Sequence, residues 1–193
     1  MARTKEFEPD VALRGAMELF LSRGYEATSM ADLVSHLGIS RASLYATFGH
    51  KDELYRKALD LYLRAQSIGP AYHLAQPGPV LPLIRSLMER YVSQVKQPNG
   101  SGGCLVVNAA IERMGADDAV ARQVESSWAE VETALRLALV RAKAQGELPE
   151  SADPRRLARF VLVVLQGLRV FARSDGDTSR LDDAVDETMR ALS

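Results

Sequence analysis

Polar side chains that suit contacts with nucleic acid are interleaved with apolar ones between Arg41 and Phe48. At helical spacing Leu44 and Phe48 fall on one side of the segment. The opposite side carries Arg41, Ser43, Tyr45 and Thr47. Arginine pairs well with guanine, and hydroxyl side chains bind phosphates or base edges. The pattern is therefore typical of a short helix that enters a DNA major groove.

A second short helix is expected just before this one, over residues 30–37, because apolar side chains recur there at helical spacing. Ser29 and Asp32 stand three residues apart at its start, as in a capping box. Gly38 stands where a left-handed C-terminal cap is needed, and Ser40 can cap the next helix. Two helices joined by so tight a turn predict a helix-turn-helix.

The first third of the chain resembles the DNA-binding signature of the TetR (tetracycline-repressor) family. The resemblance is carried by Gly24, Tyr25, Thr28, Ser29, Met30, residues 37–40, Ser43, Leu44, Tyr45, Phe48 and Lys51. His50 departs from the family, which often has Ser or Asn at this position, so the capping of the following helix is less obvious. The rest of the chain is similar to the family only in the number and spacing of its helices.

The residues expected to bind DNA share polar side chains in or beside the two helices. They are Thr28, Ser29, Ser40, Arg41, Ser43, Tyr45, Thr47, His50 and Lys51. Arg41 and Ser43 are expected to read base edges, with Thr47 as a further candidate, and Thr28, Ser29, Tyr45, His50 and Lys51 to hold phosphates. The resemblance supports Tyr45 and Lys51 best. The alternative is a plain helical hairpin in a core, but a core helix would not present these polar side chains outward.

Composition excludes several classes of protein. The 193 residues are 47% apolar with a net charge of −1, which excludes a uniformly basic coat protein. Positive charge is local, because residues 36–57 hold four Lys or Arg against two Asp or Glu. The single cysteine excludes an internal disulfide framework. The most apolar segment, residues 160–165, is too short to span a bilayer, and no signal peptide is visible, so a cytoplasmic protein that does not enter membranes is expected.

The expected fold class is all-α, with an N-terminal three-helix helix-turn-helix domain and a C-terminal helical bundle, about nine helices in all. The domain boundary is expected after residue 50, with DNA binding in residues 1–50 and ligand binding and dimerisation in residues 51–193. Besides the two helices above, helices are expected over residues 9–23, 51–67, 81–96, 104–114, 117–145, 154–174 and 179–192. Residues 69–79 are expected to form a break, and residues 98–103 a flexible loop.

The helix over residues 154–174 is apolar nearly all round its middle, and the last helix offers a companion stripe. A second apolar side indicates a partner, so two copies are expected to form a four-helix bundle, as the resemblance also implies. The expected dimer residues are Val161, Val164, Leu165, Leu168, Phe171, Val185 and Met189. The alternative is that this helix is the centre of a monomeric bundle.

A small-molecule effector site is expected within the C-terminal helices. The mixed aromatic and polar side chains that suit such a pocket are Tyr62, Tyr91, Cys104, Asn108, Trp128 and Phe160, although each alone also suits a plain core. Cys104 follows Gly102 and Gly103 at a helix start, where unpaired amides favour a thiolate. The resemblance allows a role in sensing electrophiles or oxidants. The alternative is a buried small hydrophobe.

These observations predict a ligand-responsive transcriptional regulator that binds a palindromic operator in double-stranded DNA as a homodimer. Release from the operator is expected from a small molecule or from modification of Cys104, and repression rather than activation rests on the family's habit alone. An enzyme is not expected, because three His, one Cys and no metal-spaced cluster offer little chemistry. No cofactor or metal is expected. The alternative function is an all-helical protein-interaction module without DNA binding.

Overall fold

The computed structural model describes residues 7–66, 68–95, 103–171 and 178–193. Within these residues the chain forms ten helices and no strand, which confirms the all-α class. The helices are α1 (Pro9–Arg23), α2 (Met30–Leu37), α3 (Arg41–Phe48), α4 (Lys51–Gln66), α5 (Ile68–Leu74), α6 (Val80–Val95), α7 (Leu105–Glu112), α8 (Asp118–Ala144), α9 (Pro154–Phe171) and α10 (Ser179–Ala191).

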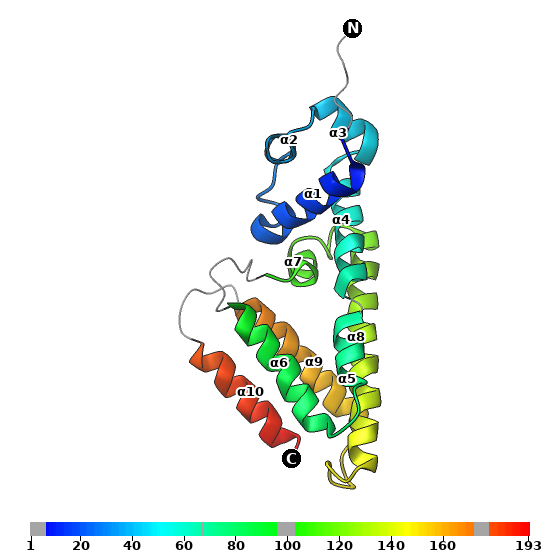
Figure 1. Ribbon diagram of the computed structural model, residues 1–193, viewed down its shortest axis with the longest axis vertical. Coiled ribbons are helices and arrows are strands. Elements are labelled where there is room, and N and C mark those ends of the chain that lie inside the picture. Colours follow the sequence, from blue (N-terminus) through cyan, green and yellow to red (C-terminus); the bar gives the residue numbers. More distant parts are fainter. Residues whose placement is uncertain (1–6, 67, 96–102, 172–177) are drawn as a thin grey trace.

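The molecule is elongated, with the head (residues 7–50, containing α1, α2 and α3) at one end (Figure 1). Helix α4 leaves the head and runs beside the long α8 into the body (Figure 1). The body consists of α5 to α10, and α7 lies against the head below α1 (Figure 1). Helix α4 packs on both α1 and α8, and α7 also contacts α1, so these two helices join the head to the body.

Two apolar cores hold these helices together. The first joins α1 to α4 with α7 and the start of α8, and its most enclosed side chains include Phe20, Leu44 and Tyr55. The second joins α5, α6, α8, α9 and α10. The first core therefore extends beyond residue 50 into α4 and α7, whereas the expected domain boundary at that residue stays a prediction.

Local sequence signals explain the helix-turn-helix. The Ser29 hydroxyl accepts a hydrogen bond from the Asp32 N–H (3.1 Å), and the Asp32 carboxylate accepts one from the Ser29 N–H (2.8 Å), so the expected capping box is present. Gly38 has φ +65° and ends α2 in the left-handed conformation that glycine favours. Ser40 caps α3 by accepting a hydrogen bond from the Ser43 N–H (3.1 Å).

The break expected over residues 69–79 is wrong for its first part, since α5 occupies residues 68–74, whereas residues 75–79 lie outside any helix. Pro70 lies in the first turn of α5, where its missing N–H is not needed, so the proline that indicated a break is tolerated. Most of the expected loop over residues 98–103, and the last residues of the helix expected to reach residue 174, lie outside the described residues.

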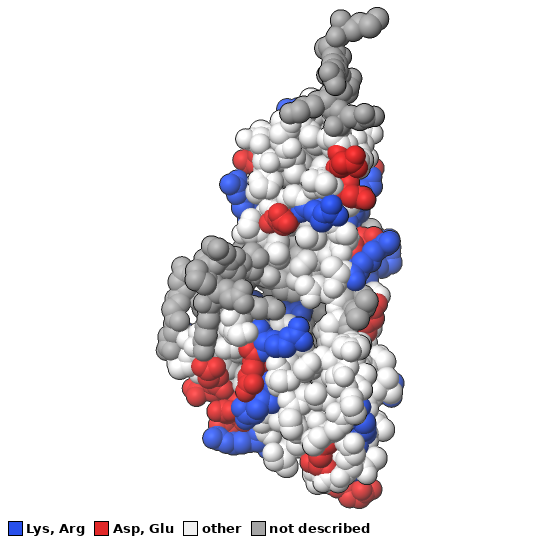
Figure 2. Space-filling view, viewed as in Figure 1, with Lys and Arg blue, Asp and Glu red and all other residues white. Residues whose placement is uncertain are grey.

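Lys and Arg side chains are interspersed with Asp and Glu on the face shown in Figure 2. Across the described ranges, none of the helices is both long enough and apolar enough to cross a membrane.

Candidate nucleic-acid interface

Helix α3 presents a polar face outward while two apolar side chains anchor it. Leu44 and Phe48 are buried in the first core, at 0% and 5% exposure. Arg41 and Thr47 are exposed, and Ser43 and Tyr45 are partly exposed beside them. The expected division of the helix into an inner and an outer side is therefore present, and the outer side is open to a partner.

Several expected DNA-binding side chains contact one another on this face. The Arg41 guanidinium reaches the Tyr45 hydroxyl (3.5 Å) and lies 5.7 Å from the centre of its ring. The Tyr45 ring also meets the His50 ring edge-to-face, with centres 5.3 Å apart. The Ser40 and Ser43 hydroxyls form a hydrogen bond with each other (2.8 Å). The polar residues from Ser40 to His50 thus include two contacting groups, one of Ser40 and Ser43 and the other of Arg41, Tyr45 and His50.

Two small residues on the outer face of α3 were missed by the sequence reasoning. Ala42 and Ala46 are exposed, and each follows directly after a polar candidate, Arg41 or Tyr45. Alanine on an outer face lets a helix approach a groove closely, and its methyl group suits the thymine methyl group. The available signal was a pair of alanines four residues apart, which together occupy one face of a helix.

The structure gives Thr28 and Lys51 internal contacts in place of the expected open ones. Thr28 is 0% exposed, and its hydroxyl donates a hydrogen bond to the Gly24 carbonyl (2.6 Å). The Lys51 ammonium donates to the carbonyls of Tyr25 and Thr28, both at 2.9 Å, and lies 3.9 Å from the centre of the Tyr25 ring. Both side chains therefore stabilise the turn before α2, and Thr28 is too enclosed to reach a phosphate with its hydroxyl.

His50 caps α4 through its main chain. Its N–H donates a hydrogen bond to the Glu53 carboxylate (2.8 Å), which is half of a capping box. Gly49 makes room for this contact, because a Cβ atom there would lie 1.8 Å from Glu53 Oε2, and its φ is +81°. The departure from the family at His50 is thus compensated by Glu53, and the His50 ring remains on the surface beside Tyr45.

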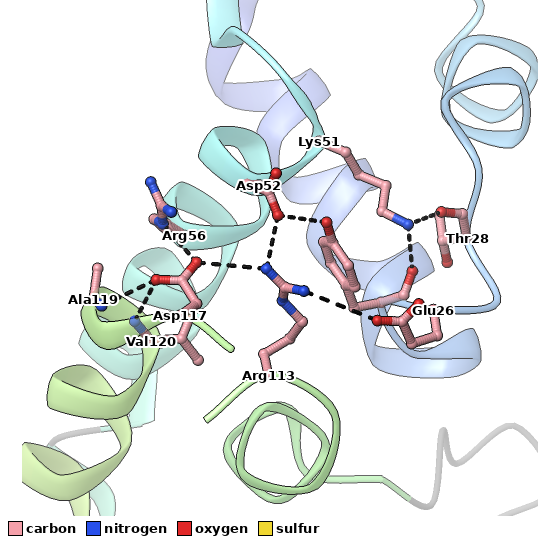
Figure 3. A network of polar contacts seen from close by, with 10 residues as sticks. Glu26, Thr28, Lys51, Asp52, Arg56, Arg113, Asp117, Ala119 and Val120 are labelled. Carbon is pink, nitrogen blue, oxygen red and sulfur yellow. Dashed lines mark hydrogen bonds and ion pairs between the residues drawn. The ribbon is translucent and has the colours of Figure 1, made fainter. Parts of the chain in front are cut away.

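A junction of polar contacts joins the head to the body (Figure 3). Arg113, which follows α7, donates to the Asp52 carboxylate at 2.8 Å and lies 4.2 Å from the centre of the Tyr25 ring. The Tyr25 hydroxyl donates to the same carboxylate oxygen at 2.5 Å, and its N–H donates to the Glu112 carboxylate at 2.6 Å. Burial and then the Asp52 contact raise the pKa of Tyr25 to about 12.

The junction continues to the start of α8 (Figure 3). Asp117 caps α8 by accepting hydrogen bonds from the N–H groups of Ala119 and Val120, at 3.0 and 3.2 Å. Its other oxygen accepts a hydrogen bond from Arg56 of α4 at 2.8 Å. Burial disfavours its charge, but the bonds from Arg56 and the two amides outweigh that effect and hold the pKa of Asp117 below its usual value.

The local excess of positive charge is largely used by these contacts. Lys51 binds carbonyls, Arg56 pairs with Asp117, and the Lys57 ammonium donates to the Phe48 carbonyl (3.4 Å). Arg41 is the basic residue of this group whose contact lies on the outer face of α3. The group still places positive charge near the head, and each of its side chains makes a contact within the protein.

The expected effector residues separate into two groups. Tyr62, Tyr91 and Cys104 converge on Arg169 of α9, which the sequence reasoning missed. Arg169 donates hydrogen bonds to the Tyr91 hydroxyl (2.6 Å) and to Cys104 Sγ (3.4 Å). Burial and then the neighbouring Cys104 raise the pKa of Tyr62 above its ordinary value. The available signal for Arg169 was a lone arginine between Leu168 and Val170 in an apolar segment.

The other three expected effector residues lie elsewhere. Asn108 is buried and donates a hydrogen bond to the Leu21 carbonyl of α1 (3.3 Å), so it belongs to the contact between α7 and the head. Trp128 packs on the first core. Phe160 is 42% exposed on α9, because it stands on the helix side that faces away from the second core. The structure therefore does not place these three beside Arg169.

Two cavities lie between α4 and α8. The inner one has a volume of about 40 Å³ and is lined by Tyr62, Leu63, Gln66, Pro70, Ala71, Val106, Ser127, Glu130, Val131 and Arg169. The outer one has a volume of about 290 Å³ and is lined by Asp60, Leu63, Arg64, Gln123, Ser126, Ser127 and Glu130. Both are lined by α4 residues, so an occupant of either would contact the helix that carries the head. No group of three or more His, Cys, Asp or Glu within the described ranges could hold a metal ion.

Four of the seven expected dimer residues require correction, and the other three stay a prediction. Val161, Leu165, Leu168 and Val185 are buried in the second core of their own chain, at 0–3% exposure. The reason is that α9 packs on α6, α8 and α10, and α10 packs on α6 and α9. Val164 and Met189 are partly buried there, and Phe171 is exposed. The exposed large apolar side chains of this region lie on other sides of α8 and α9. They are Leu137, Val140, Phe160, Val163, Val170 and Phe171.

Comparison with known proteins gives the same assignment for both halves of the chain. Residues 12–58 match the family described as bacterial regulatory proteins, tetR family. Residues 80–188 match the family described as tetracyclin repressor-like, C-terminal domain.

Similarity also extends over whole chains. The uncharacterized HTH-type transcriptional regulator YezE of Bacillus subtilis (strain 168) is 38% identical over 193 residues, all of both chains. The HTH-type transcriptional repressor ComR of Escherichia coli (strain K12) is 32% identical, covering 97% of this chain and 90% of its own. A solved structure of the TetR family transcriptional regulator CifR, a cysteine mutant complexed with 26-bp double-strand operator DNA, has 32% identity and a TM-score of 0.85 over all of both chains.

Proposed function

This chain belongs to the TetR family of DNA-binding transcriptional regulators, and we propose that it is a homodimeric repressor that an effector releases from a palindromic operator. The observation that carries the proposal is the outward polar face of α3, with Leu44 and Phe48 buried behind it. CifR, which is similar over its full length, is bound to operator DNA in its solved structure. A regulator of this kind acts where the DNA is, in the cytoplasm.

DNA recognition would divide between base edges and phosphates. Arg41 is exposed and carries the side chain that suits guanine, so we assign it to base reading together with Ser43 and Thr47. The exposed methyl groups of Ala42 and Ala46 would allow close approach to the groove. We assign phosphate contacts to Ser29, Ser40, Tyr45 and His50, whose side chains are exposed or partly exposed. Lys51 would act mainly by holding the turn before α2.

Dimerisation would use α8 and α9. These helices contact each other and expose apolar side chains, of which Val163 is 70% and Leu137 is 58% exposed. Two such helices from each copy would make a four-helix bundle and cover these side chains. A two-fold dimer then presents two α3 helices to successive major grooves, about 34–36 Å apart.

The effector would act on α4. Tyr62, Leu63 and Gln66 of this helix line the inner cavity, and Asp52 and Arg56 of the same helix belong to the polar junction. An occupant that moves α4 would therefore change the separation of the two heads, which a fixed operator spacing does not tolerate. Modification of Cys104 would act at the same place, because its sulfur contacts Arg169, which lines the cavity.

The test is binding of the pure protein to its own upstream DNA, measured by fluorescence anisotropy at low and at rising salt. We expect specific binding that weakens as salt rises, because phosphate contacts release counterions. A thiol-reactive electrophile is then added to wild type and to Cys104→Ser. Release of wild type alone assigns the response to Cys104, whereas retention of both directs the search to a reversible ligand. Absence of binding at low salt would favour the protein-interaction alternative and refute the repressor.

A further inference from the structure

We propose that the inner cavity binds the carboxylate of a small organic monocarboxylic acid, with Arg169 as its ionic partner. The inference deepens the proposed function, because it assigns a chemical class to the effector. It begins from an unusual balance of charge at Arg169. Within the described residues, Arg169 forms no ion pair with Asp or Glu, and its partners are the Tyr91 hydroxyl and Cys104 Sγ.

Arg169 is partly buried, and a cation that loses part of its hydration is normally paired with an anion, because desolvation is costly. Burial does oppose the charge of Arg169, but the neighbouring Cys104, Tyr91 and Tyr62 outweigh it and raise the pKa of Arg169 above its ordinary value. The guanidinium therefore remains charged while it lines a cavity. A ligand that brings one negative charge would supply the missing counter-ion.

The geometry suits a planar carboxylate. Arg169 is held in place by its hydrogen bond to Tyr91 and by stacking on that ring, with Cζ 4.2 Å from the ring centre. A fixed guanidinium offers paired N–H donors that match the two oxygens of a carboxylate. Tyr62 and Gln66 line the same cavity and supply polar groups that can orient the ligand.

Size and charge limit the ligand further. A cavity of about 40 Å³ exceeds the space that one water requires, so it has room for a carboxylate group but not for a large acid. The outer cavity of about 290 Å³ shares Leu63, Ser127 and Glu130 with it and can take the rest of the molecule. Glu130 lines both cavities, but in the inner one the positive charge of Arg169 offsets it. The outer cavity holds Asp60 and Glu130 against Arg64, and this excess of negative charge would disfavour a second carboxylate, so monocarboxylates should bind better than dicarboxylates.

The experiment measures binding without DNA. Acetate, butyrate, benzoate and succinate are titrated into the full-length protein at constant ionic strength, by calorimetry and by thermal melting, with acetamide and benzamide as uncharged controls. The variants are Arg169→Gln and, as a matched control, Arg141→Gln, which removes an arginine that binds the Leu74 carbonyl outside both cavities. Tyr91→Phe removes the hydroxyl that orients Arg169 and keeps the ring.

We expect at least one monocarboxylate to bind and to raise the melting temperature, while its amide does neither. Kd should rise about tenfold or more in Arg169→Gln and less in Tyr91→Phe, and Arg141→Gln should bind as wild type. If Arg169→Gln fails to fold, Arg169→Lys and Tyr91→Phe carry the comparison. The inference is overturned if no carboxylate binds more tightly than its amide. It is also overturned if the Kd of the carboxylate is unchanged by the substitutions at Arg169 and Tyr91.

Operator binding is measured separately in the same carboxylates. If a carboxylate binds but does not release the DNA, the anion site is supported and the carboxylate is refuted as the effector. If another compound releases the DNA and no carboxylate binds, the proposed repressor function is supported and the anion site is refuted.

Discussion

Arg113 and Asp52 form an ion pair of 2.8 Å that connects the body to the first turn of α4. The same carboxylate accepts the Tyr25 hydroxyl from the head, and the same guanidinium lies over the Tyr25 ring. Three segments that are distant in sequence thus meet at one pair of side chains (Figure 3). The orientation of the head on the body depends on this pair as well as on apolar packing.

Removing the Arg113–Asp52 pair should destabilise the protein and loosen the head. In a double-mutant cycle with Arg113→Gln and Asp52→Asn, we expect a coupling free energy of about 1–3 kcal/mol, because Arg113 is only 15% exposed. Urea denaturation measures the coupling. The exposed pair Arg190–Glu187 is the control and should give about 0.5 kcal/mol or less. Equal coupling in both pairs would contradict a special role for the junction.

Arg41→Ala should reduce specificity at one operator position. We expect a loss of about 1–3 kcal/mol on the operator and little loss on random DNA, because the exposed guanidinium is assigned to a base edge. Tyr45→Phe should instead weaken binding to both DNAs by a similar factor. Anisotropy titrations with both duplexes separate the two effects. Equal losses on the two duplexes for Arg41→Ala would refute its assignment to base reading.

Val163→Glu should dissociate the dimer. Its side chain is 70% exposed on α9, and two carboxylates brought into an apolar interface would oppose association. Sedimentation measures the state of assembly. Ile111→Glu is the matched control, because Ile111 of α7 is 71% exposed outside the α8–α9 surface. A dimer that survives the Val163 substitution and dissociates with the Ile111 one would move the interface to α7.

Asp117→Asn should destabilise the protein at neutral pH and lose its effect in acid. Asparagine caps a helix about as well as aspartate, so the substitution tests the charge that accepts the Arg56 hydrogen bond. The pKa of Asp117 is lowered on folding, so its contribution is complete above about pH 4, the ordinary value, and is lost as pH falls through the lowered one. The urea midpoints of wild type and Asp117→Asn are measured at pH 7 and at pH 3. The difference between the two midpoints should be smaller at pH 3 than at pH 7.

Gly49→Ala should destabilise the start of α4. The new Cβ atom would lie 1.8 Å from Glu53 Oε2, and the backbone has φ +81°, so we expect a cost of at least about 1 kcal/mol. Thermal melting measures the cost. Gly115→Ala is the control, because nothing lies within 4 Å of a Cβ atom there, and it should be neutral or slightly stabilising. A neutral Gly49→Ala would mean that the Glu53 cap does not depend on this glycine.

The head was predictable because its signals are local. Capping by Ser29 and Ser40, the left-handed Gly38 and the spacing of Leu44 and Phe48 depend on residues within one or two helical turns. These features are sufficient to predict the bounds of α2 and α3 without the rest of the chain. The polar junction was not predictable, because Arg113 and Asp52 are 61 residues apart and nothing local indicates that they meet.

The apolar pattern of α9 predicted that the helix has more than one apolar side. It did not predict which side packs within the chain and which side remains exposed. The helix packs on α6, α8 and α10, so the stripe with Val161, Leu165 and Leu168 is used within the chain. The exposed stripe with Phe160 and Val163 is equally apolar in sequence. Which stripe is internal depends on how the other helices pack, and this information is not local. The same limit concealed Arg169, whose partners come from α6 and the start of α7.

The extent of the first core determines how this protein can be recombined with its relatives. Buried side chains of the head share that core with Leu54 and Tyr55 of α4, Val106 of α7 and Val124 of α8. A chimera joined at residue 50 would therefore place the head of one protein on the α4 and α7 surface of another and mismatch the packing. Exchange of DNA specificity between relatives should require α4 and α7 to be transplanted with the head. Substitution of the exposed residues of α3 alone offers the simpler route, because it leaves this core intact.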